Sequence, residues 1–319
     1  MFKKLINNQI FQVSVRNYKP RRALMYVPGS DERKIDKIRS LQVDCVALDC
    51  EDGVALNKKE DARKLITEKL KDIIPTARND VGVRVNSIDS GLCEEDIKSC
   101  LSGSHLPHTL LLPKVETTEH LKWVADKLNN TLETGQKINL IIYIESAIAF
   151  INLHDICKTA ASLSETGKFT PTSLVFGSDD FCASIGATRT ENSNEILYAR
   201  QKLVLYAKAF NLQAIDMVYI KYKDPDGLKS QCEEGMRMGY TGKQVIHPNQ
   251  IGIVQESFMP SIDTIEWAQG LLDAFERHQA TGKGAFTYRG SMIDMPTMKQ
   301  AKNIIDLIQS VKKKDPVNN

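Results

Sequence analysis

The sequence predicts an α/β fold, a (β/α)₈ TIM barrel followed by a C-terminal helical and loop extension that acts as a lid. Three observations predict it. Eight short apolar segments recur along the 319 residues, helical segments separate them, and four of the apolar segments end in a polar residue. The carboxyl ends of barrel strands converge on one face, which holds the active site of such proteins. Arg84, Glu145, Asp180 and His247 are therefore expected to share one site.

The eight apolar segments are predicted strands, because near-continuous apolar runs are typical of strands buried on both faces. They are ALMYVPG (23–29), CVALDCEDG (45–53), VGVRVNS (81–87), HTLLLPKV (108–115), INLIIYIES (138–146), SLVFGSDD (173–180), QAIDMVYI (213–220) and GKQVIHP (242–248). Helical stretches lie between them, such as 30–41, 59–71 and 196–210. This alternation favours a closed barrel over a Rossmann fold, since no G-x-G-x-x-G follows any of the strands.

The two ends of the chain differ from the barrel. Residues 1–22 carry six basic side chains and no acidic one, interleaved with apolar residues, as in an amphipathic mitochondrial presequence. A disordered basic tail is the alternative. We expect a targeting segment at 1–22, a catalytic barrel at 23–280 and a lid at 281–319, in a protein of the mitochondrial matrix.

The C-terminal extension combines helices with a shaped loop. A helix near 262–280 leads to AFTYRGSMIDMP (285–296), and a second helix runs to about residue 314. Glycines, an aromatic pair, two methionines and a proline are typical of a shaped loop rather than of a core element. We expect this extension to cover the mouth of a barrel, its own or that of a neighbouring subunit.

Composition excludes several classes of partner. A net charge of +2 does not favour nucleic acid. No apolar run approaches the roughly 20 residues that span a bilayer, so no membrane segment is expected. The seven cysteines form no C-x-x-C pair and do not cluster with the six histidines, which indicates reduced thiols rather than disulfides or a zinc site.

Glu145 and Asp180 are the leading candidates for metal ligands. They follow neighbouring strands, so their carboxylates are expected to approach each other at the barrel mouth. Two ionised carboxylates that close repel unless a cation or a proton lies between them. Mg²⁺ prefers one or two carboxylates with waters and substrate oxygens. Carboxylates that merely cap backbone amides are the alternative, and Asp179 is a rival ligand to Asp180.

Arg84 is the candidate for binding an anionic group. Its guanidinium is permanently charged and offers planar donors to a carboxylate or a developing enolate oxygen. A structural salt bridge to Glu51 or Asp52, at the end of the second strand, is the alternative, and both roles could hold together. One of these carboxylates could also hold a metal-bound water. Lys114 ends the fourth strand and could reach an anionic ligand.

Two further groups of residues have open interpretations. Basic residues follow the first two strands (Arg33, Lys34, Lys37, Lys58, Lys59 and Arg63) and could bind phosphate at helix N-termini, although a charge run is usually a solvated helix face. Asp294 lies among methionines, isoleucine and proline, in surroundings that raise a carboxyl pKa and suit a general acid or base. A surface turn before Pro296 is the alternative.

Taken together, these segments resemble a known family. The motifs are RRALMYVPGSDERKI, LDCEDGVALNKKEDAR, VRVNS, LLPKVE, IESA, FGSDDF, GKQVIHPNQI and GAFTYRGSMIDMP. They are similar to the citrate lyase β-subunit-like branch of the HpcH/HpaI aldolase superfamily, from about residue 21 to about residue 299. Each motif alone is modest, but their order at successive strand ends is specific.

The resemblance implies roles for individual residues. It implies that Glu145 and Asp180 bind Mg²⁺, because the family's ligand directly precedes a phenylalanine, here Phe181. It implies that Arg84 binds substrate and stabilises an enolate, and that Asp294 is the catalytic acid/base on a lid donated by a neighbour in a homotrimer. The implied contacts to substrate and coenzyme A are Tyr26, Arg33, Lys37, Lys58, Lys59, Glu60, Asp61, Ala62, Arg63, Arg84, Ile246 and His247.

The resemblance also implies an activity. The substrates are an acyl-CoA and a 2-oxo acid, and the reaction is retro-Claisen cleavage of (3S)-citramalyl-CoA to acetyl-CoA and pyruvate. One alternative is condensation of acetyl-CoA with glyoxylate, as in a malate synthase. The other is a non-catalytic barrel subunit that binds coenzyme A.

Overall fold

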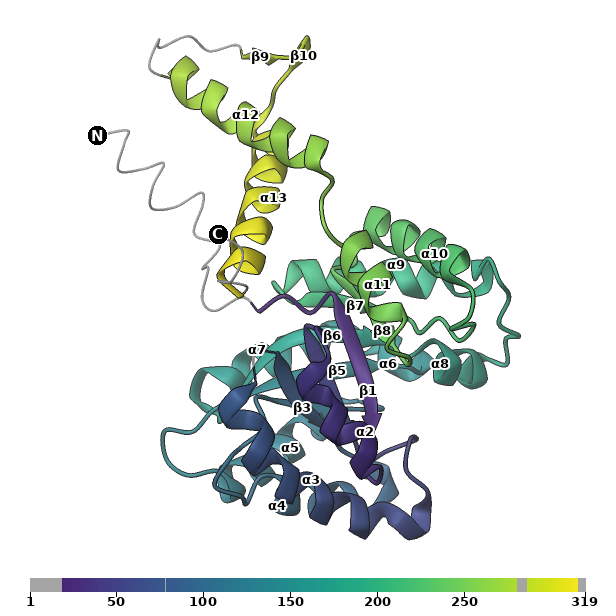
Figure 1. Cartoon of the computed structure of the whole chain (residues 1–319). Coiled ribbons are helices and arrows are strands. Elements are labelled where there is room, and N and C mark those ends of the chain that lie inside the picture. Colours follow the sequence, from purple (N-terminus) through teal and green to yellow (C-terminus); the bar gives the residue numbers. More distant parts are fainter. Residues whose placement is uncertain (1–18, 78, 280–285, 315–319) are drawn as a thin grey trace. The chain divides into compact units, whose positions relative to one another are not determined.

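A computed structural model describes residues 19–77, 79–279 and 286–314 of the chain. The chain divides into two compact units, each described here by itself. The first extends from Arg21 to Phe258, and the second includes the chain from Met259 onward. Figure 1 labels the elements of both.

Eight parallel strands form the first unit and close into a barrel in the order β1 to β8. The pairing of Leu24 with Gln244 joins the last strand to the first. The strands are β1 (Ala23–Pro28), β2 (Cys45–Asp49), β3 (Asp80–Arg84), β4 (Thr109–Leu112), β5 (Ile138–Ile144), β6 (Phe169–Phe176), β7 (Gln213–Asp216) and β8 (Gly242–Val245). The predicted barrel is confirmed, and each of the eight predicted segments overlaps one of these strands, although β3 begins at Asp80 and β6 at Phe169, before the predicted starts at 81 and 173.

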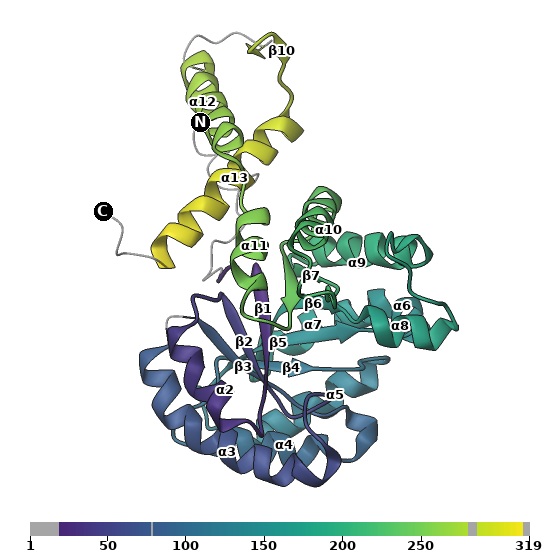
Figure 2. The ribbon, with the colours of Figure 1, turned by 45° about the vertical axis from the view of Figure 1, so that its right-hand side comes forward.

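Helices lie on the outside of the strands (Figure 2). They are α2 (Glu32–Asp36), α3 (Lys59–Ile73), α4 (Cys93–Cys100), α5 (Thr118–Thr131), α6 (Ala147–Ile151), α7 (Leu153–Thr166), α8 (Ser178–Ile185), α9 (Leu197–Ala209), α10 (Pro225–Met238) and α11 (Gln250–Ser257). Helix α3 illustrates why they pack there. Its buried Ala62, Ile66, Leu70 and Ile73 recur at helical spacing and form one apolar stripe.

The barrel interior is a packed core of its own. Strand residues alternate, so Ala23, Met25 and Val27 of β1 face the helices while Leu24 and Tyr26 face inward. The inward cluster comprises Leu24, Cys45, Ala47, Leu111, Ile141, Tyr143, Val175 and Ile215, with Tyr26 packed against it. The barrel is therefore filled by side chains and is not a pore, and in such barrels the active site lies at the carboxyl ends of the strands.

Two arginines assigned by the sequence to the targeting segment belong to the barrel instead. Arg21 is only 2% exposed, and its Nη2 lies 2.6 Å from Asp80 Oδ2. Arg22 bonds Asp44 through Nε at 2.7 Å. Composition counts a basic residue in the same way whether it lies in a presequence or in a buried ion pair of the barrel. The sequence therefore could not separate Arg21 and Arg22 from the predicted targeting segment. Residues 1–18 of that segment lie outside the described residues.

We expect Arg21→Ala to destabilise the barrel by about 3–5 kcal/mol, because it leaves the buried Asp80 carboxylate without its guanidinium partner. Urea unfolding monitored by circular dichroism measures this change. Arg237→Ala is the matched control, since Arg237 is 64% exposed and lies 4.0 Å from Glu233. Equal unfolding midpoints for the two variants would contradict a structural role for Arg21.

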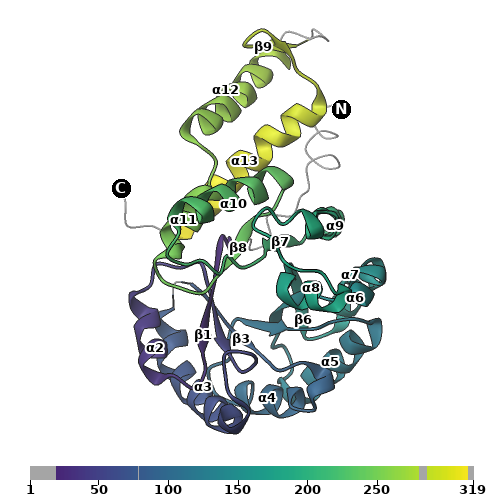
Figure 3. The same cartoon turned by 90° about the vertical axis from the view of Figure 1, so that its right-hand side faces the viewer.

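The second unit consists of α12 (Ile262–Gln279), a hairpin of β9 (Thr287–Tyr288) and β10 (Ser291–Met292), and α13 (Met295–Lys314). Arg289 and Gly290 both have positive φ, as a two-residue type I′ turn requires. Figure 3 shows α12 and α13 together. The predicted loop at 285–296 is thus a short hairpin over its described part.

This unit has a small core, formed by Ala268, Leu271, Phe286, Met298 and Ala301. The predicted barrel domain ended at 280, whereas the first unit ends at Phe258. The boundary differs because α12 buries its apolar side against α13. No helix in the described ranges is both long and apolar enough to cross a membrane.

Candidate active site

Arg84 is clamped by carboxylates that follow β2. Its Nε lies 2.8 Å from Asp49 Oδ1 and its Nη2 lies 2.6 Å from Asp49 Oδ2. Its Nη1 lies 2.8 Å from Glu51 Oε2 and 3.7 Å from Asp52 Oδ2. The predicted salt bridge to Glu51 is therefore present, but Asp49 is the bidentate partner that the sequence reasoning missed. Asp49 and Arg84 are register partners on neighbouring strands, which holds the guanidinium in one place.

Tyr26 supports the same guanidinium from below. The Arg84 Cζ lies 4.6 Å from the centre of the Tyr26 ring, within range of a cation–π interaction. Tyr26 donates a hydrogen bond of 2.8 Å to Gln244 Oε1, so the Tyr143 hydroxyl, 2.7 Å away, donates to Tyr26. Burial raises the pKa of Tyr26 well above its ordinary value and keeps the phenol neutral. The sequence reasoning missed Tyr143 and Gln244. Alternate residues of a barrel strand face the interior, and this alternation along β5 and β8 could have identified them.

Glu145 directly follows β5 and is buried, with 5% of its surface exposed. Its Oε1 accepts a hydrogen bond of 2.6 Å from the backbone N–H of Lys114. Gly177 makes room for it, since a Cβ there would lie 2.1 Å from Glu145 Oε2. Burial, with the negative charges of Glu51 and Asp180, raises the pKa of Glu145 from 4.5 to about 8. A cation beside this carboxylate would reverse that shift.

We expect the raised pKa to make the metal-free protein less stable as pH rises. The folded state holds the Glu145 proton up to about pH 8, whereas the unfolded state releases it near 4.5, so stability falls through that window. Glu145→Gln removes this proton equilibrium. In EDTA, the variant should gain thermal stability over the native protein near pH 8 and lose that advantage near pH 5. Exposed Glu165→Gln is the control, and parallel pH profiles for both variants would contradict the assignment.

The structure separates Asp179 from its rival Asp180. Asp180 lies in the first turn of α8, and its Oδ1 is 3.7 Å from Lys114 Nζ. Asp179 instead pairs with Arg189. Strand β6 ends at Phe176, so Asp180 reaches the site from a helix and not from the predicted strand end.

Lys114 lies at the centre of the acidic group. Its Nζ is 3.0 Å from Glu51 Oε1 and 3.8 Å from Asp52 Oδ1, in addition to its contact with Asp180. We call the set Asp49, Glu51, Asp52, Glu145 and Asp180 the acid cluster. Two cationic side chains, Arg84 and Lys114, contact it, so negative charge is in excess. That excess and the oxygen donors suit a hard divalent cation.

Any metal site in the described part of the chain takes few of its ligands from the protein. No group of three or more His, Cys, Asp or Glu side chains there is arranged to hold a metal ion. Mg²⁺ needs only one or two carboxylates and takes its other oxygens from water and substrate. The donor set of Glu145 and Asp180 therefore fits Mg²⁺.

Three residues predicted to bind coenzyme A make structural contacts within the barrel. Lys59 Nζ donates to Cys50 O and Glu51 O at 2.7 Å and to Asn86 Oδ1 at 2.8 Å, which uses all three of its hydrogens. Arg63 bonds the buried Asp96, and Ala62 is fully buried. These contacts argue against phosphate binding by Lys59, whose ammonium hydrogens are all used, whereas the role of Arg63 stays a prediction. Lys58, Glu60 and Asp61 are exposed and pair with near neighbours along the helix.

The other predicted contacts are accessible. Arg33 and Lys37 are exposed on and just after α2. Ile246 and His247 follow β8, and both backbone N–H groups donate to Gln250 Oε1. The His247 ring stacks on Tyr222 with 4.8 Å between ring centres. Their roles in binding a ligand stay predictions.

Asp294 lies in the second unit and is exposed, contrary to the expected apolar surroundings. It caps α13, with Oδ1 accepting hydrogen bonds from Thr297 Oγ1 at 2.6 Å and Thr297 N at 2.9 Å. These bonds lower its pKa, whereas the sequence predicted a raised one. The correction follows from the hairpin, which leaves Met292 80% and Met295 48% exposed.

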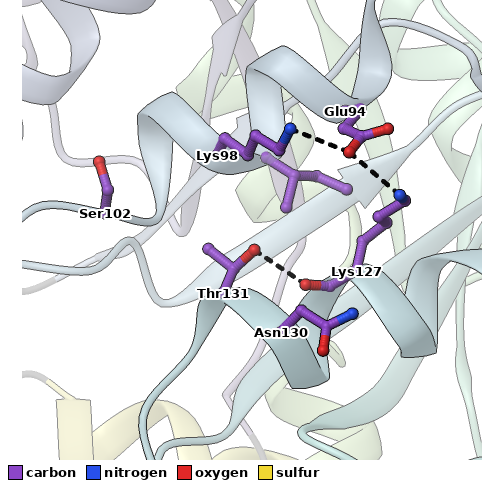
Figure 4. A pocket seen from close by; sticks show the side chains of 7 residues that line it. Glu94, Lys98, Ser102, Lys127, Asn130 and Thr131 are labelled. Carbon is purple, nitrogen blue, oxygen red and sulfur yellow. Dashed lines mark hydrogen bonds and ion pairs between the residues drawn. The ribbon is translucent and has the colours of Figure 1, made fainter.

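A hollow of about 370 Å³ lies between α4 and α5 on the outside of the barrel (Figure 4). Glu94 pairs there with Lys98 and Lys127, each at 3.0 Å. The lining residues are Glu94, Ile97, Lys98, Ser102, Lys127, Asn130 and Thr131. None of them belongs to the acid cluster or to the predicted site.

The fold and the acid cluster together define a (β/α)₈-barrel enzyme with its reactive groups at the carboxyl ends of the strands. Residues 22–248 match the profile of the HpcH/HpaI aldolase/citrate lyase family. The chain belongs to this family, as its motifs predicted, and it is a carbon–carbon lyase.

Curated relatives cover nearly the whole chain. The mitochondrial citramalyl-CoA lyase of Homo sapiens is 52% identical over 307 residues, covering 94% of this chain and 89% of the human protein. The enzyme of Mus musculus is 50% identical and covers 95% of this chain and 90% of its own. A (3S)-malyl-CoA thioesterase of Cereibacter sphaeroides is 31% identical, covering 86% and 90%.

Solved structures share the fold. A citrate lyase from Burkholderia xenovorans has a TM-score of 0.78 at 19% identity, covering 93% of this chain and 94% of its own. The protein CitE of Mycobacterium tuberculosis, in complex with magnesium, acetoacetate and coenzyme A, has a TM-score of 0.69 at 22% identity, covering 90% and 97%. At these identities the likeness shows the fold alone.

Proposed function

We propose that this lyase cleaves (3S)-citramalyl-CoA to acetyl-CoA and pyruvate in the presence of Mg²⁺. The observation that carries the proposal is the acid cluster around Arg84 at the strand ends, in a chain 52% identical to a mitochondrial citramalyl-CoA lyase. The bond broken joins the tertiary carbon to the methylene beside the thioester. The hydroxyl loses its proton and becomes the ketone of pyruvate, and the methylene takes up a proton to become the acetyl methyl group.

Glu145 and Asp180 are the proposed metal ligands. Their oxygens belong to the cluster in which negative charge exceeds positive, and burial leaves Glu145 with a raised pKa that a cation would lower. When bound, Mg²⁺ supplies Lewis-acid polarisation of substrate oxygens. The proposal of a metal site is therefore based on the oxygen donors of Glu145 and Asp180.

Arg84 stabilises the negative charge that develops on the thioester oxygen. Its position is preset by Asp49, Glu51 and the Tyr26 ring, so little reorganisation is needed as charge develops. The guanidinium already binds the carboxylates of Asp49 and Glu51, which fix its plane. The proposed role of Arg84 is therefore to donate to the enolate oxygen from this fixed position.

Asp294 is the proposed acid/base, carried by the C-terminal unit of a neighbouring chain in a homotrimer. Where it is exposed, the lowered pKa keeps it ionised at neutral pH, which suits proton abstraction in the condensing direction. Burial against a substrate raises a carboxyl pKa and suits proton donation to the enolate carbon. Covering the site would thus select the protonation state that cleavage needs.

Pyruvate release from (3S)-citramalyl-CoA, followed with Mg²⁺ and with EDTA, tests the reaction. Fast cleavage that EDTA abolishes is the expected result. Condensation of acetyl-CoA with glyoxylate in place of cleavage would support the synthase alternative and overturn the proposal. Cleavage at an unchanged rate in EDTA would contradict the proposed dependence on Mg²⁺.

We expect Glu145→Gln to lose most of its affinity for Mg²⁺, because an amide oxygen carries no charge. Differential scanning fluorimetry measures it, since a bound ligand raises the melting temperature. Mg²⁺ should raise that of the native protein and leave that of the variant unchanged. An equal rise in both would remove Glu145 from the ligand set.

We also propose a mitochondrial location. The human, mouse and rat relatives are mitochondrial proteins by name, and the first 22 residues are basic and interleaved with apolar residues. Fusion of residues 1–20 to a fluorescent protein tests targeting, with Lys3, Lys4 and Arg16 replaced by glutamate as the control. A diffuse signal from the unmodified fusion would contradict the proposal.

A further inference from the structure

Lys114 has a strained backbone at the centre of the acid cluster. Its φ of 53° lies in the left-handed region that residues other than glycine rarely adopt, and such strain concentrates at functional positions. In this conformation its backbone N–H donates to Glu145 Oε1 at 2.6 Å. The same residue therefore orients one proposed metal ligand through its backbone.

The side chain of Lys114 reaches the other proposed ligand. Its ammonium lies 3.7 Å from Asp180 Oδ1, 3.0 Å from Glu51 Oε1 and 3.8 Å from Asp52 Oδ1. Three carboxylates within 4 Å therefore surround the ammonium and favour its charged form. It thus occupies the position of a counter-ion among carboxylates from the turn after β2 and from the first turn of α8.

Lys59 provides a contrast within the same region. Its ammonium is 9% exposed and is fully used by two backbone oxygens and an amide oxygen, which is a structural arrangement. The side chain of Lys114 is 35% exposed, and its ammonium contacts carboxylates, those of Glu51, Asp52 and Asp180. A half-exposed ammonium on carboxylates can move away when another cation takes them.

We propose that Lys114 is a positioning residue that competes with the divalent cation for Asp180, and so sets the metal affinity of the site. The inference rests on the proposed function in one respect, that Glu145 and Asp180 bind Mg²⁺. The ammonium neutralises the acid cluster and opposes a second positive charge beside it. The backbone N–H, by contrast, favours the metal because it holds Glu145 in place.

The test is titration calorimetry of Mg²⁺ into the metal-free full-length protein, without substrate. Lys114→Met removes the ammonium and keeps the side-chain length, so Mg²⁺ should bind on the order of tenfold more tightly, as expected for one lost charge in a half-solvated site. Lys114→Arg keeps the charge and should bind within about twofold of the native protein. Lys122→Met is the charge-matched control, because Lys122 is 56% exposed and pairs only with Glu119.

A second variant separates competition from folding. Lys114→Gly removes the ammonium and relieves the left-handed backbone, so it should fold at least as readily and also bind Mg²⁺ more tightly. A merely structural lysine predicts the opposite, weaker binding in both variants. Unchanged or weaker Mg²⁺ binding by folded Lys114→Met and Lys114→Gly overturns the inference. If the native protein itself takes up no Mg²⁺, the proposed metal site fails, which is a distinct result.

Discussion

Replacement of Arg84 by alanine is expected to lower kcat for cleavage by about 10²–10³, the range for loss of one preset donor to a developing oxyanion. The reason is geometric. Asp49 and Glu51 hold the guanidinium, and Tyr26 lies under it, so its donors are in place before negative charge develops. Steady-state pyruvate release, with kcat and KM determined separately, measures the effect. A loss confined to KM would mean that Arg84 only binds substrate.

A conservative variant controls for damage to the acid cluster. Arg84→Ala leaves Asp49 and Glu51 without their partner, so a folding defect is a rival cause of lost activity. Arg84→Lys retains the charge but not the planar fork, and should retain the fold while losing most of the rate. Arg39→Ala, at an exposed arginine bonded to Asp72 O, should leave kcat unchanged. Native kcat in folded Arg84→Lys would contradict a role for the fork.

Asp294→Ala is the second substitution with a large expected effect, a loss of most turnover with affinity for coenzyme A retained. Alanine also removes the cap of α13, at a cost of about 1 kcal/mol in stability. Asp294→Asn keeps a capping oxygen but cannot transfer a proton, so it isolates the chemistry. Equal losses of kcat in both variants are expected. Near-native turnover in Asp294→Asn would show that Asp294 acts only as a cap.

Mixing variants tests whether Asp294 acts on a neighbouring chain. Subunits with Arg84→Lys retain Asp294, and subunits with Asp294→Asn retain Arg84. If the C-terminal unit serves a neighbour, refolding the two together should restore cleavage that neither has alone. Absence of any restored activity in mixed oligomers would place both residues on the same chain.

Much of the barrel could be predicted from the sequence, because buried parallel strands are continuous apolar runs. The carboxyl ends of the strands could not be predicted, because the strand-like sequence segments continue into the turns. The predicted sixth strand reaches 180, whereas β6 ends at Phe176. Asp180 consequently belongs to α8. The choice of Asp180 over Asp179 as a ligand came from resemblance and stays a prediction; in the structure Lys114 contacts Asp180 and Arg189 pairs with Asp179.

The site was predictable where one polar residue ends a strand, and not where several compete. Glu145 stands alone after β5, whereas Asp49, Glu51 and Asp52 follow one another and only coordinates assign Arg84 its bidentate partner. Lys59 points inward although its neighbour Lys58 is exposed, because α3 turns about 100° per residue. The apolar residues next to Asp294 in the sequence likewise do not bury its carboxylate in the structure.

Gly177 and Glu145 are under different evolutionary constraints, although they touch. A side chain at 177 would collide with the Glu145 Cβ at 2.5 Å as well as with its carboxylate, so any residue longer than glycine at 145 excludes it. The path of the backbone therefore requires glycine at 177, whereas only the proposed metal chemistry requires glutamate at 145. A descendant barrel that abandoned catalysis could lose the carboxylate and would still have to inherit the glycine. Among distant relatives, the glycine should mark descent and the glutamate should mark activity.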